Sequence, residues 1–311
     1  MSKDFYKVFE KIPDIIKSPF EMTEPNQAIS IFRGDFSLTR GVDFISLTGE
    51  VYFAWFPNNR VNFKGEVTNS SKDVISLTTS DDNFVLIIDG LVFAKASVTN
   101  MNASSSFLIE GVTFGESVKG DKSIPVSKVN FVIPNLRKFS GKVVKEETDD
   151  GIRTSNSRLQ FTNSKYNIVI DKSTDYDLLH DTLTKTGGYV TLYSGQISAT
   201  KGKIEFNELV DLIDCFSKFL SFINGRRCAP LFFTGTHNDQ IIWTDFSGYS
   251  TDQFKYVFTW PSKTSAEGLD QLWQTFSHLW NDPNERDFIN SAIHWYVESN
   301  AHSGYLEGSI I

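Results

Sequence analysis

Apolar and polar residues alternate with a period of two through the first part of the chain, and this pattern restricts the fold more than any other feature. It recurs in "ISIFRGDFSLTRG", "GEVYFAWF", "RVNFKGEV", "NFVLIIDGLVFAKASV", "SSFLIEGVTFGE" and "SKVNFVIPNL". Pro57-Asn58-Asn59 and Asp89-Gly90 separate such segments and predict hairpin turns. About eight strands, spaced roughly ten residues apart, predict a β-sandwich or barrel.

The second half mixes two periods. "SRLQFTNSKYNIVID", "YVTLYSGQISA", "APLFFTG", "QIIWTDF" and "QFKYVFTW" predict further strands. Apolar residues at helical spacing predict a helix from Glu205 to Asn224, and Gly225 is suited to end it in the left-handed conformation. Two more helices are expected over residues 265–280 and 285–299. This half therefore predicts an α+β domain with an antiparallel sheet and C-terminal helices.

The charged run "KEETDDG" at residues 145–151 marks the expected boundary between these halves. We predict an α+β protein of two domains. Residues 1–145 form a β-sandwich or barrel-like domain, and residues 146–311 form an α+β domain that ends in helices. A short first helix, broken at Pro13, is expected near the start.

Composition excludes several classes of protein. Apolar residues make up 40% of the chain and aromatic residues 14%, which is enough for a packed core. The formal net charge of −8 argues against binding of nucleic acid through a basic surface. The start of the chain lacks the apolar segment of a signal peptide, and no window has the roughly 18 consecutive apolar residues of a membrane helix. We expect a cytoplasmic protein without a membrane partner, in which Cys215 and Cys228 form no disulfide.

No pattern typical of catalysis is present. The sequence has no Gly-x-Ser-x-Gly and no Gly-x-x-x-x-Gly-Lys-Ser/Thr motif. None of the five histidines lies at metal-ligand spacing from another or from a cysteine. Adjacent carboxylates such as Asp149-Asp150 diverge in an extended chain, whereas acid–base catalysis needs them to converge. The prediction is no catalytic residue, no metal and no cofactor.

Two arginines in "INGRRCAP" suggest a binding site. Arg226 and Arg227 follow the predicted end of a helix, where guanidinium groups could hold an anion by parallel donors. The interpretation that the sequence favours is that they satisfy the last carbonyls and the dipole of that helix. With His237 and Asp245 they form the set of residues from which a long-range ligand, nuclease or hydrolase site could be assembled.

Apolar residues near the C-terminus indicate an interface. "YLEGSII" reads as the first turns of a new helix after Gly304, too short to be stable alone. The interface set is Trp295, Tyr296, Tyr305, Leu306 and Ile310. These side chains are expected to pack on a partner chain, on a second copy, or on a helical segment that is missing. The crowding of tryptophans in the last third is assigned to core packing, with a stacking platform for bases or sugars as the alternative.

The segments "FSKFLSFINGRRCAPLFFTG", "IIWTDF" and "SAIHWYVESNAHSGYLEGSII" resemble the region ahead of the helical domain in bacterial ApeA-like HEPN proteins. The resemblance implies a β-rich part that senses or binds, followed by a HEPN domain that is associated with RNA cleavage in anti-phage defence. HEPN nucleases carry an arginine and a histidine separated by about four to six residues on one helix. Arg286 and His294 have seven residues between them. The resemblance thus implies that the helical effector domain is missing here.

Three functions remain open on the sequence alone. The first is a non-catalytic sensing module of a bacterial defence protein, which binds an unknown protein or a phage-derived ligand. The second is a nuclease or hydrolase with a site in the C-terminal half. The third is an assembly protein that self-associates through its C-terminal helix.

Overall fold

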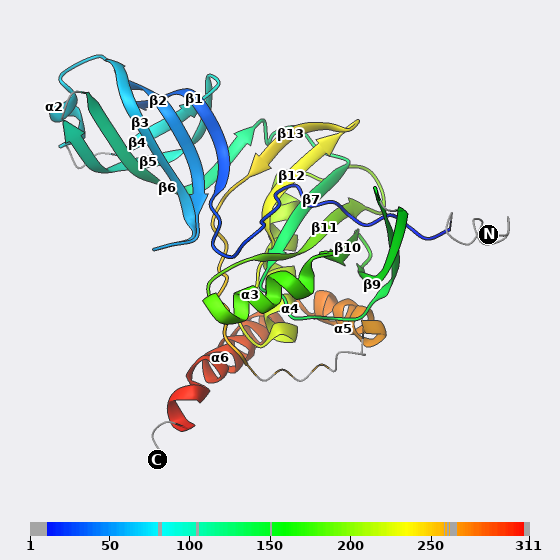
Figure 1. Ribbon diagram of the computed structural model, residues 1–311. Helices are drawn as coiled ribbons and strands as arrows, with labels where there is room; N and C mark the ends of the chain where they lie inside the picture. Colours follow the sequence, from blue (N-terminus) through cyan, green and yellow to red (C-terminus); the bar gives the residue numbers. More distant parts are fainter. Residues whose placement is uncertain are drawn as a thin grey trace. The chain divides into compact units, whose positions relative to one another are not determined.

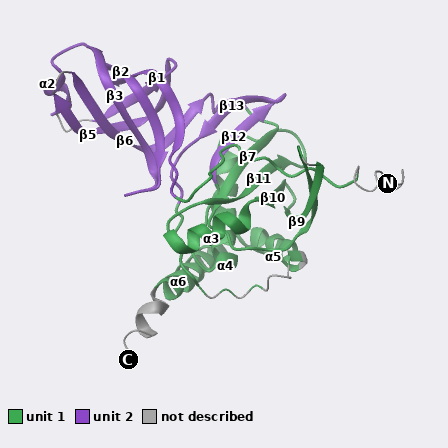
Figure 2. Ribbon diagram, in the orientation of Figure 1, with its two compact units in different colours: residues 1–25, 125–230, 250–311 green, residues 26–124, 231–249 purple. Residues whose placement is uncertain are grey.

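The computed structural model describes residues 11–79, 83–103, 106–149, 151–257, 259, 261 and 266–307, with residues 267 and 302–307 described by their backbone alone. Two compact units share the chain (Figure 2). Unit 1 contains residues 1–25, 125–230 and 250–311, and unit 2 contains residues 26–124 and 231–249. The predicted β-rich α+β class is confirmed.

Unit 2 is built around a closed antiparallel barrel of six strands. Its members are β1 (Ile29–Arg40), β2 (Asp43–Ala54), β3 (Arg60–Ser70), β4 (Phe84–Ile88), β5 (Leu91–Ala103) and β6 (Phe107–Gly120), with the short helix α2 (Val74–Thr78) after β3. The pairing of β3 with β6 closes the barrel. β12 (Leu231–His237) and β13 (Gln240–Asp245) return from late in the chain, and β13 pairs with β6.

Apolar and polar residues alternate in these strands because every second side chain points into the barrel. Phe36, Leu38, Val51, Phe53 and Phe63 are at most 4% exposed. The predicted hairpins are confirmed: residues 55–59 join β2 to β3, and Asp89-Gly90 join β4 to β5. Asp89 and Gly90 have φ angles of 51° and 76°, as a tight hairpin turn of this kind requires.

Three glycines lie side by side on the barrel, since Gly34 pairs with Gly49 and Gly49 pairs with Gly65. A Cβ on Gly49 would lie 2.1 Å from the carbonyl oxygen of Lys64 and 2.5 Å from the Cα of Gly65. β2 and β3 therefore approach closely only because this side chain is absent.

Gly49→Ala should lower the free energy of unfolding by about 1–3 kcal/mol, because β2 and β3 must separate to admit the methyl group. Gly268→Ala is the control. Gly268 lies in a helix with no atom within 4 Å of the added Cβ. The substitution should therefore raise the free energy of unfolding by about 0.5–1 kcal/mol. Urea unfolding of both variants checks the pair, and equal effects would show that the contact at Gly49 is irrelevant.

Unit 1 contains a five-stranded antiparallel sheet in the order β7-β11-β10-β9-β8. The strands are β7 (Lys128–Pro134), β8 (Lys142–Thr148), β9 (Gly151–Thr162), β10 (Tyr166–Lys172) and β11 (Thr191–Ala199). The helices are α3 (Tyr176–Thr186), α4 (Phe206–Asn224), α5 (Ala266–Leu279) and α6 (Pro283–Glu307). α4 and α5 cover the sheet (Figure 1), and rings from β9, α4 and α5 pack together there.

Several predicted boundaries fall differently in the structure. Within residues 145–151, expected as a break between domains, residues 145–148 form the end of β8 and Gly151 begins β9. The division at residue 145 stays a prediction. No helix forms over residues 11–16, where Asp14 instead bridges to Lys145; the rest of the expected first helix lies outside the described residues. Residues 253–257 form no strand.

The prediction of a new helix after Gly304 is wrong, because α6 continues from Pro283 to Glu307. A single glycine costs a helix only about 1 kcal/mol and does not end it. The apolar side chains of α6 are not all buried. Ile293 and Val297 are buried, whereas Phe288 is 70% exposed.

Candidate functional site

The passage from α4 into the next segment places the two predicted arginines. Gly225 ends α4 with a φ angle of 74°, as predicted, and its carbonyl accepts a hydrogen bond of 2.8 Å from the Asn300 side-chain amide on α6. Arg226 and Arg227 follow directly. Their guanidinium groups donate to residues outside α4, so capping of the helix by these cations is not what the structure shows.

Arg226 is a buried cation without a hydrogen-bonded carboxylate. Its side chain is 7% exposed. Nη1 donates to the Lys255 carbonyl at 2.5 Å, Nη2 donates to the Asn135 carbonyl at 2.7 Å, and the guanidinium lies 4.6 Å from the ring centre of Phe254. Nε is buried and has no partner among the described residues. Because buried charges are normally paired, this cation lacks the hydrogen-bonded carboxylate that would usually offset its charge.

Asn135 organises the floor beneath Arg226. Its φ angle of 56° is one that asparagine tolerates better than most residues. Its amide nitrogen donates to the Gly188 carbonyl at 2.9 Å, and its amide oxygen accepts from the Val190 backbone at 3.1 Å. Asn135 was not predicted as a site residue. The only signal was its place after Pro134 at the end of a predicted strand.

Arg137 adds a second positive charge to the same region. Its guanidinium lies 5.4 Å from the ring centre of Phe139, and its Nη1 is buried without a partner in the described part of the chain. Burial lowers the pKa of Arg137 and also that of Arg226. The positive charge of Arg137 lowers the pKa of Arg226 further. The buried hydroxyl of Tyr296, near Arg137, also lacks a partner.

Arg227 differs from Arg226 because it is paired. Its guanidinium donates to Asp252 at 3.2 Å and to Glu298 on α6. Partial burial alone would lower the pKa of Arg227, but these two carboxylates raise it above its ordinary value. Arg227 thus links the segment 250–257 to α6.

A hollow of about 370 Å³ opens over these residues. Three cations line it, Arg226, Arg227 and Lys255, against one carboxylate, Asp252. The remaining lining consists of Tyr189, Thr251, Gln253, Val257 and Ala301. We call this hollow the arginine pocket. Its lining carries more positive than negative charge although the whole chain is acidic.

His180 on α3 lies near Arg226, because both side chains contact the ring of Phe254. Its imidazole stacks on Tyr176, with ring centres 5.4 Å apart, and meets the edge of Phe254. Burial, followed by the positive charge of Arg226, lowers the pKa of His180.

An NMR titration of the His180 imidazole should give a pKa below the ordinary histidine value, and Arg226→Gln should raise it. The native state then binds this proton less readily than the unfolded chain. Stability is therefore lost as the pH falls through the unfolded-state pKa towards the native one. A titration at the ordinary value in both proteins would show that Arg226 does not act on His180.

His237 and Asp245, the other residues of the predicted site, belong to unit 2, at the ends of β12 and β13. Asp245 is 2% exposed and accepts hydrogen bonds from the Ser247 backbone at 2.8 Å and the Tyr249 hydroxyl at 3.0 Å. Burial raises its pKa. The combination of these two residues with Arg226 and Arg227 stays a prediction.

Of the predicted interface residues, Trp295 is 68% exposed. Tyr296 is partly buried against Phe222 on α4, with ring centres 6.2 Å apart. The side chains of Tyr305 and Leu306, and the whole of Ile310, lie outside the described residues. An interface through this set stays a prediction.

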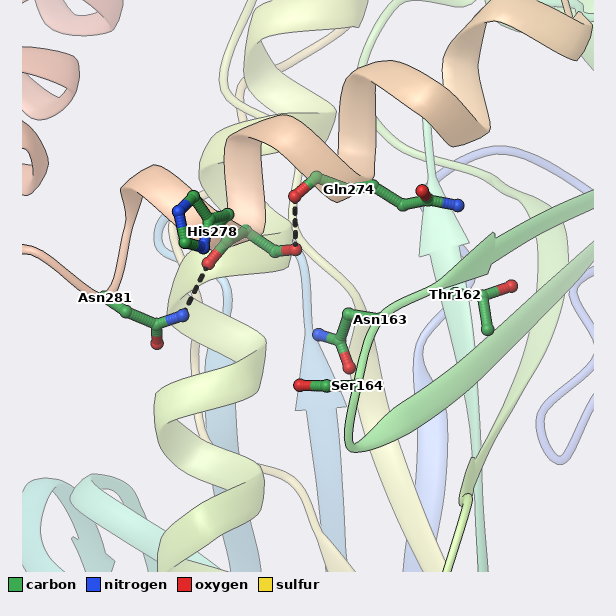
Figure 3. Close-up of a pocket in the computed structure, with 7 residues that line it drawn as sticks. Thr162, Asn163, Ser164, Gln274, His278 and Asn281 are labelled. Carbon is green, nitrogen blue, oxygen red and sulfur yellow. Dashed lines mark hydrogen bonds between the residues drawn. The ribbon is translucent and has the colours of Figure 1, made fainter.

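A second hollow is lined by polar side chains, among them His278. Thr162, Asn163 and Ser164 on the β9–β10 turn face the end of α5 across it (Figure 3). On α5, the Ser277 hydroxyl donates to the Gln274 carbonyl at 3.2 Å, and the Asn281 amide donates to the Ser277 carbonyl at 2.9 Å. These polar groups complete the end of the helix, which explains their presence without a ligand.

The described residues lack two further features. They contain no group of three histidine, cysteine, aspartate or glutamate side chains that could hold a metal ion. They also contain no helix that combines the length and the apolar character needed to cross a membrane.

Comparison with known proteins places the arginine pocket in a recognised region. The model of the YopA central domain family matches residues 121–257. Arg226 and Lys255, which line the pocket, fall within this range, and so do Asn135 and Arg137 beside it. Glu298 and Tyr296 on α6 lie beyond it.

One relative covers nearly the whole chain. The SPbeta prophage-derived uncharacterized protein YopA of Bacillus subtilis (strain 168) is 27% identical in an alignment of 303 residues that covers 94% of this chain and 66% of that protein. The chain thus spans slightly less than two thirds of the relative's length. No solved structure matches the chain. These matches carry no support for the ApeA-like HEPN relationship that the sequence suggested.

Proposed function

We propose that the chain is a non-catalytic binding module of a phage-derived bacterial protein, and that its ligand is an anion held in the arginine pocket. The observation that carries this proposal is Arg226, a residue that lines the pocket, is 7% exposed and makes no hydrogen bond to a carboxylate. An anion in the pocket would offset this buried positive charge. Arg137 and Lys255 add to the same attraction.

The chemistry of the pocket favours binding over turnover. Arg227 is occupied by Asp252 and Glu298, and Arg226 donates to two backbone carbonyls. These contacts fix both cations in place, which suits recognition. A nuclease or hydrolase would also need a nucleophile or a general base directed into the pocket. Neither the sequence nor the lining provides one in a convergent arrangement.

The prophage origin of the relative supports a role at the contact between a phage and its bacterial host. We extend the proposal to a sensing role in anti-phage defence, with a phosphate-bearing ligand of phage origin as the recognised molecule. The ApeA-like resemblance suggested a HEPN effector beside such a sensor, and that arrangement stays a prediction.

Isothermal titration calorimetry, which measures the affinity of the full chain for inorganic phosphate, tests the binding proposal. Lys255→Gln should weaken binding by up to about fivefold, as for an exposed charge. Arg226→Gln should weaken it by about 10- to 100-fold, as for a buried charged hydrogen bond. Lys201→Ala, an exposed lysine elsewhere in unit 1, is the control and should change nothing.

Circular dichroism shows whether the Arg226→Gln variant folds. If that variant does not fold, the weaker binding expected of Lys255→Gln still tests the proposal. Binding that all three variants weaken equally would reduce the effect to general charge. RNA hydrolysis by the wild-type chain that Arg226→Gln abolishes would replace the binding proposal with the enzyme alternative.

A further inference from the structure

Unit 1 contains a third hollow, with a volume of about 470 Å³. It shares no lining residue with the arginine pocket. It lies between residues 15–23, the start of α3 and β11. Part of its lining is apolar and is formed by Ile15, Ile16, Met22, Leu178 and Leu179. Leu178 is 70% exposed although it lines this hollow.

Two largely buried residues of β11 form its floor. Thr191 is 7% exposed and Ser194 is 8% exposed, and both line the hollow. Neither hydroxyl makes a hydrogen bond with another group in the portion of the chain that the structure describes. Neither oxygen is among the fully buried atoms that lack a partner, so both hydroxyls are open to an occupant that donates hydrogen bonds.

Acidic side chains from three elements surround this floor. Glu21, Glu146 and Asp175 line the hollow together with a single cation, Lys17. None of the three carboxylates forms an ion pair with another described residue. The lining therefore carries one positive charge against three negative charges, so it repels anions and attracts cations.

The wall formed by residues 15–23 is fixed in position. The Ile16 amide donates to the buried Asp171 carboxylate at 2.8 Å, and the Ile15 amide donates to the Lys145 carbonyl at 2.8 Å. The Ser18 hydroxyl donates to the Phe20 carbonyl at 2.6 Å. A hollow whose walls are already ordered loses little conformational freedom when it binds a ligand.

We propose that this hollow binds a linear aliphatic polyamine. The alkyl chain of such a molecule would lie against the apolar walls, and its ammonium groups would donate to the carboxylates and to the floor hydroxyls. A purely apolar ligand would leave Thr191 and Ser194 without partners, and an anion would face three carboxylates. A compact metal cation would leave the apolar walls unused.

Titration calorimetry of the full chain with spermidine tests this inference at fixed ionic strength. Glu146→Gln should weaken binding about three- to tenfold, because a partly buried charge pair is lost. Glu147→Gln is the matched control: it is the next residue on β8, is exposed and does not line the hollow, so it should leave the affinity unchanged. Thr191→Val, which removes only the hydroxyl, should weaken binding about two- to tenfold.

Absence of spermidine binding to the folded wild-type chain would overturn the inference. Equal weakening by Glu146→Gln and Glu147→Gln would also overturn it, since the attraction would then be general charge. Arg226→Gln should leave spermidine binding unchanged, so a failure here is distinguishable from a failure of the anion proposal.

Discussion

Arg158→Ala should lower the free energy of unfolding by about 3–5 kcal/mol, because it leaves the buried carboxylate of Asp171 without its counter-charge. Arg158 Nε and Nη2 donate to the two carboxylate oxygens at 2.9 and 2.6 Å, and the Asp171 side chain is fully buried. The same guanidinium donates to the Asp14 carbonyl at 2.6 Å. The variant should therefore also release residues 14–16 from the sheet.

Chemical denaturation measures the loss of stability, and hydrogen exchange at the Ile16 amide measures the release. Two comparisons make the result specific. The double variant Arg158→Met with Asp171→Leu should be more stable than Arg158→Ala, since no unpaired charge remains. Arg33→Ala breaks an exposed pair with Glu50 in unit 2 and should cost less than about 1 kcal/mol. A cost for Arg158→Ala as small as that would refute the assignment of a buried ion pair.

Trp273→Ala is the second change for which a large loss is expected, again about 3–5 kcal/mol. The indole is fully buried, and its ring centre lies 5.3 Å from those of Phe216 and Phe219 and 6.4 Å from that of Phe161. These rings join α4 and α5 to β9. Removing the indole leaves a cavity in the core of unit 1 that the packed rings cannot fill.

Trp295→Ala supplies the contrast, because Trp295 is 68% exposed and its loss should change stability by no more than about 0.5 kcal/mol. Trp273→Phe should cost less than Trp273→Ala, since the indole nitrogen has no hydrogen-bond partner among the described residues. Thermal or urea unfolding decides both. Equal losses for the two alanine variants would mean that the aromatic cluster does not stabilise unit 1.

The sequence predicts those parts of the fold that depend on neighbouring residues. Alternation identified the strands of the barrel, Asp89-Gly90 identified a hairpin, and Gly225 identified the end of α4. Contacts between distant residues could not be derived in this way. The closure of the barrel by β3 and β6, and the return of β13 to β6, join segments whose patterns do not specify their partners.

The candidate site also has features that depend on neighbouring residues, which could be predicted, and contacts between distant residues, which could not. Arg226 and Arg227 were recognisable as cations beside a helix end, but the sequence could not show that one would be buried and the other paired. The difference arises because Asn135, Lys255 and Asp252, all distant in sequence, meet these arginines in space. Arg137 gave no signal at all, because a lone arginine after a strand is ordinarily a surface residue.

Diffraction from a crystal soaked in selenate tests the central claim most directly, because the anomalous signal of selenium locates the anion itself. The proposed function predicts one anion in the arginine pocket, with an oxygen within hydrogen-bond distance of the Arg226 guanidinium. It also predicts that this signal is lost in Arg226→Gln and kept in Lys201→Ala. Selenate found only at exposed lysines, with the arginine pocket empty, would contradict it.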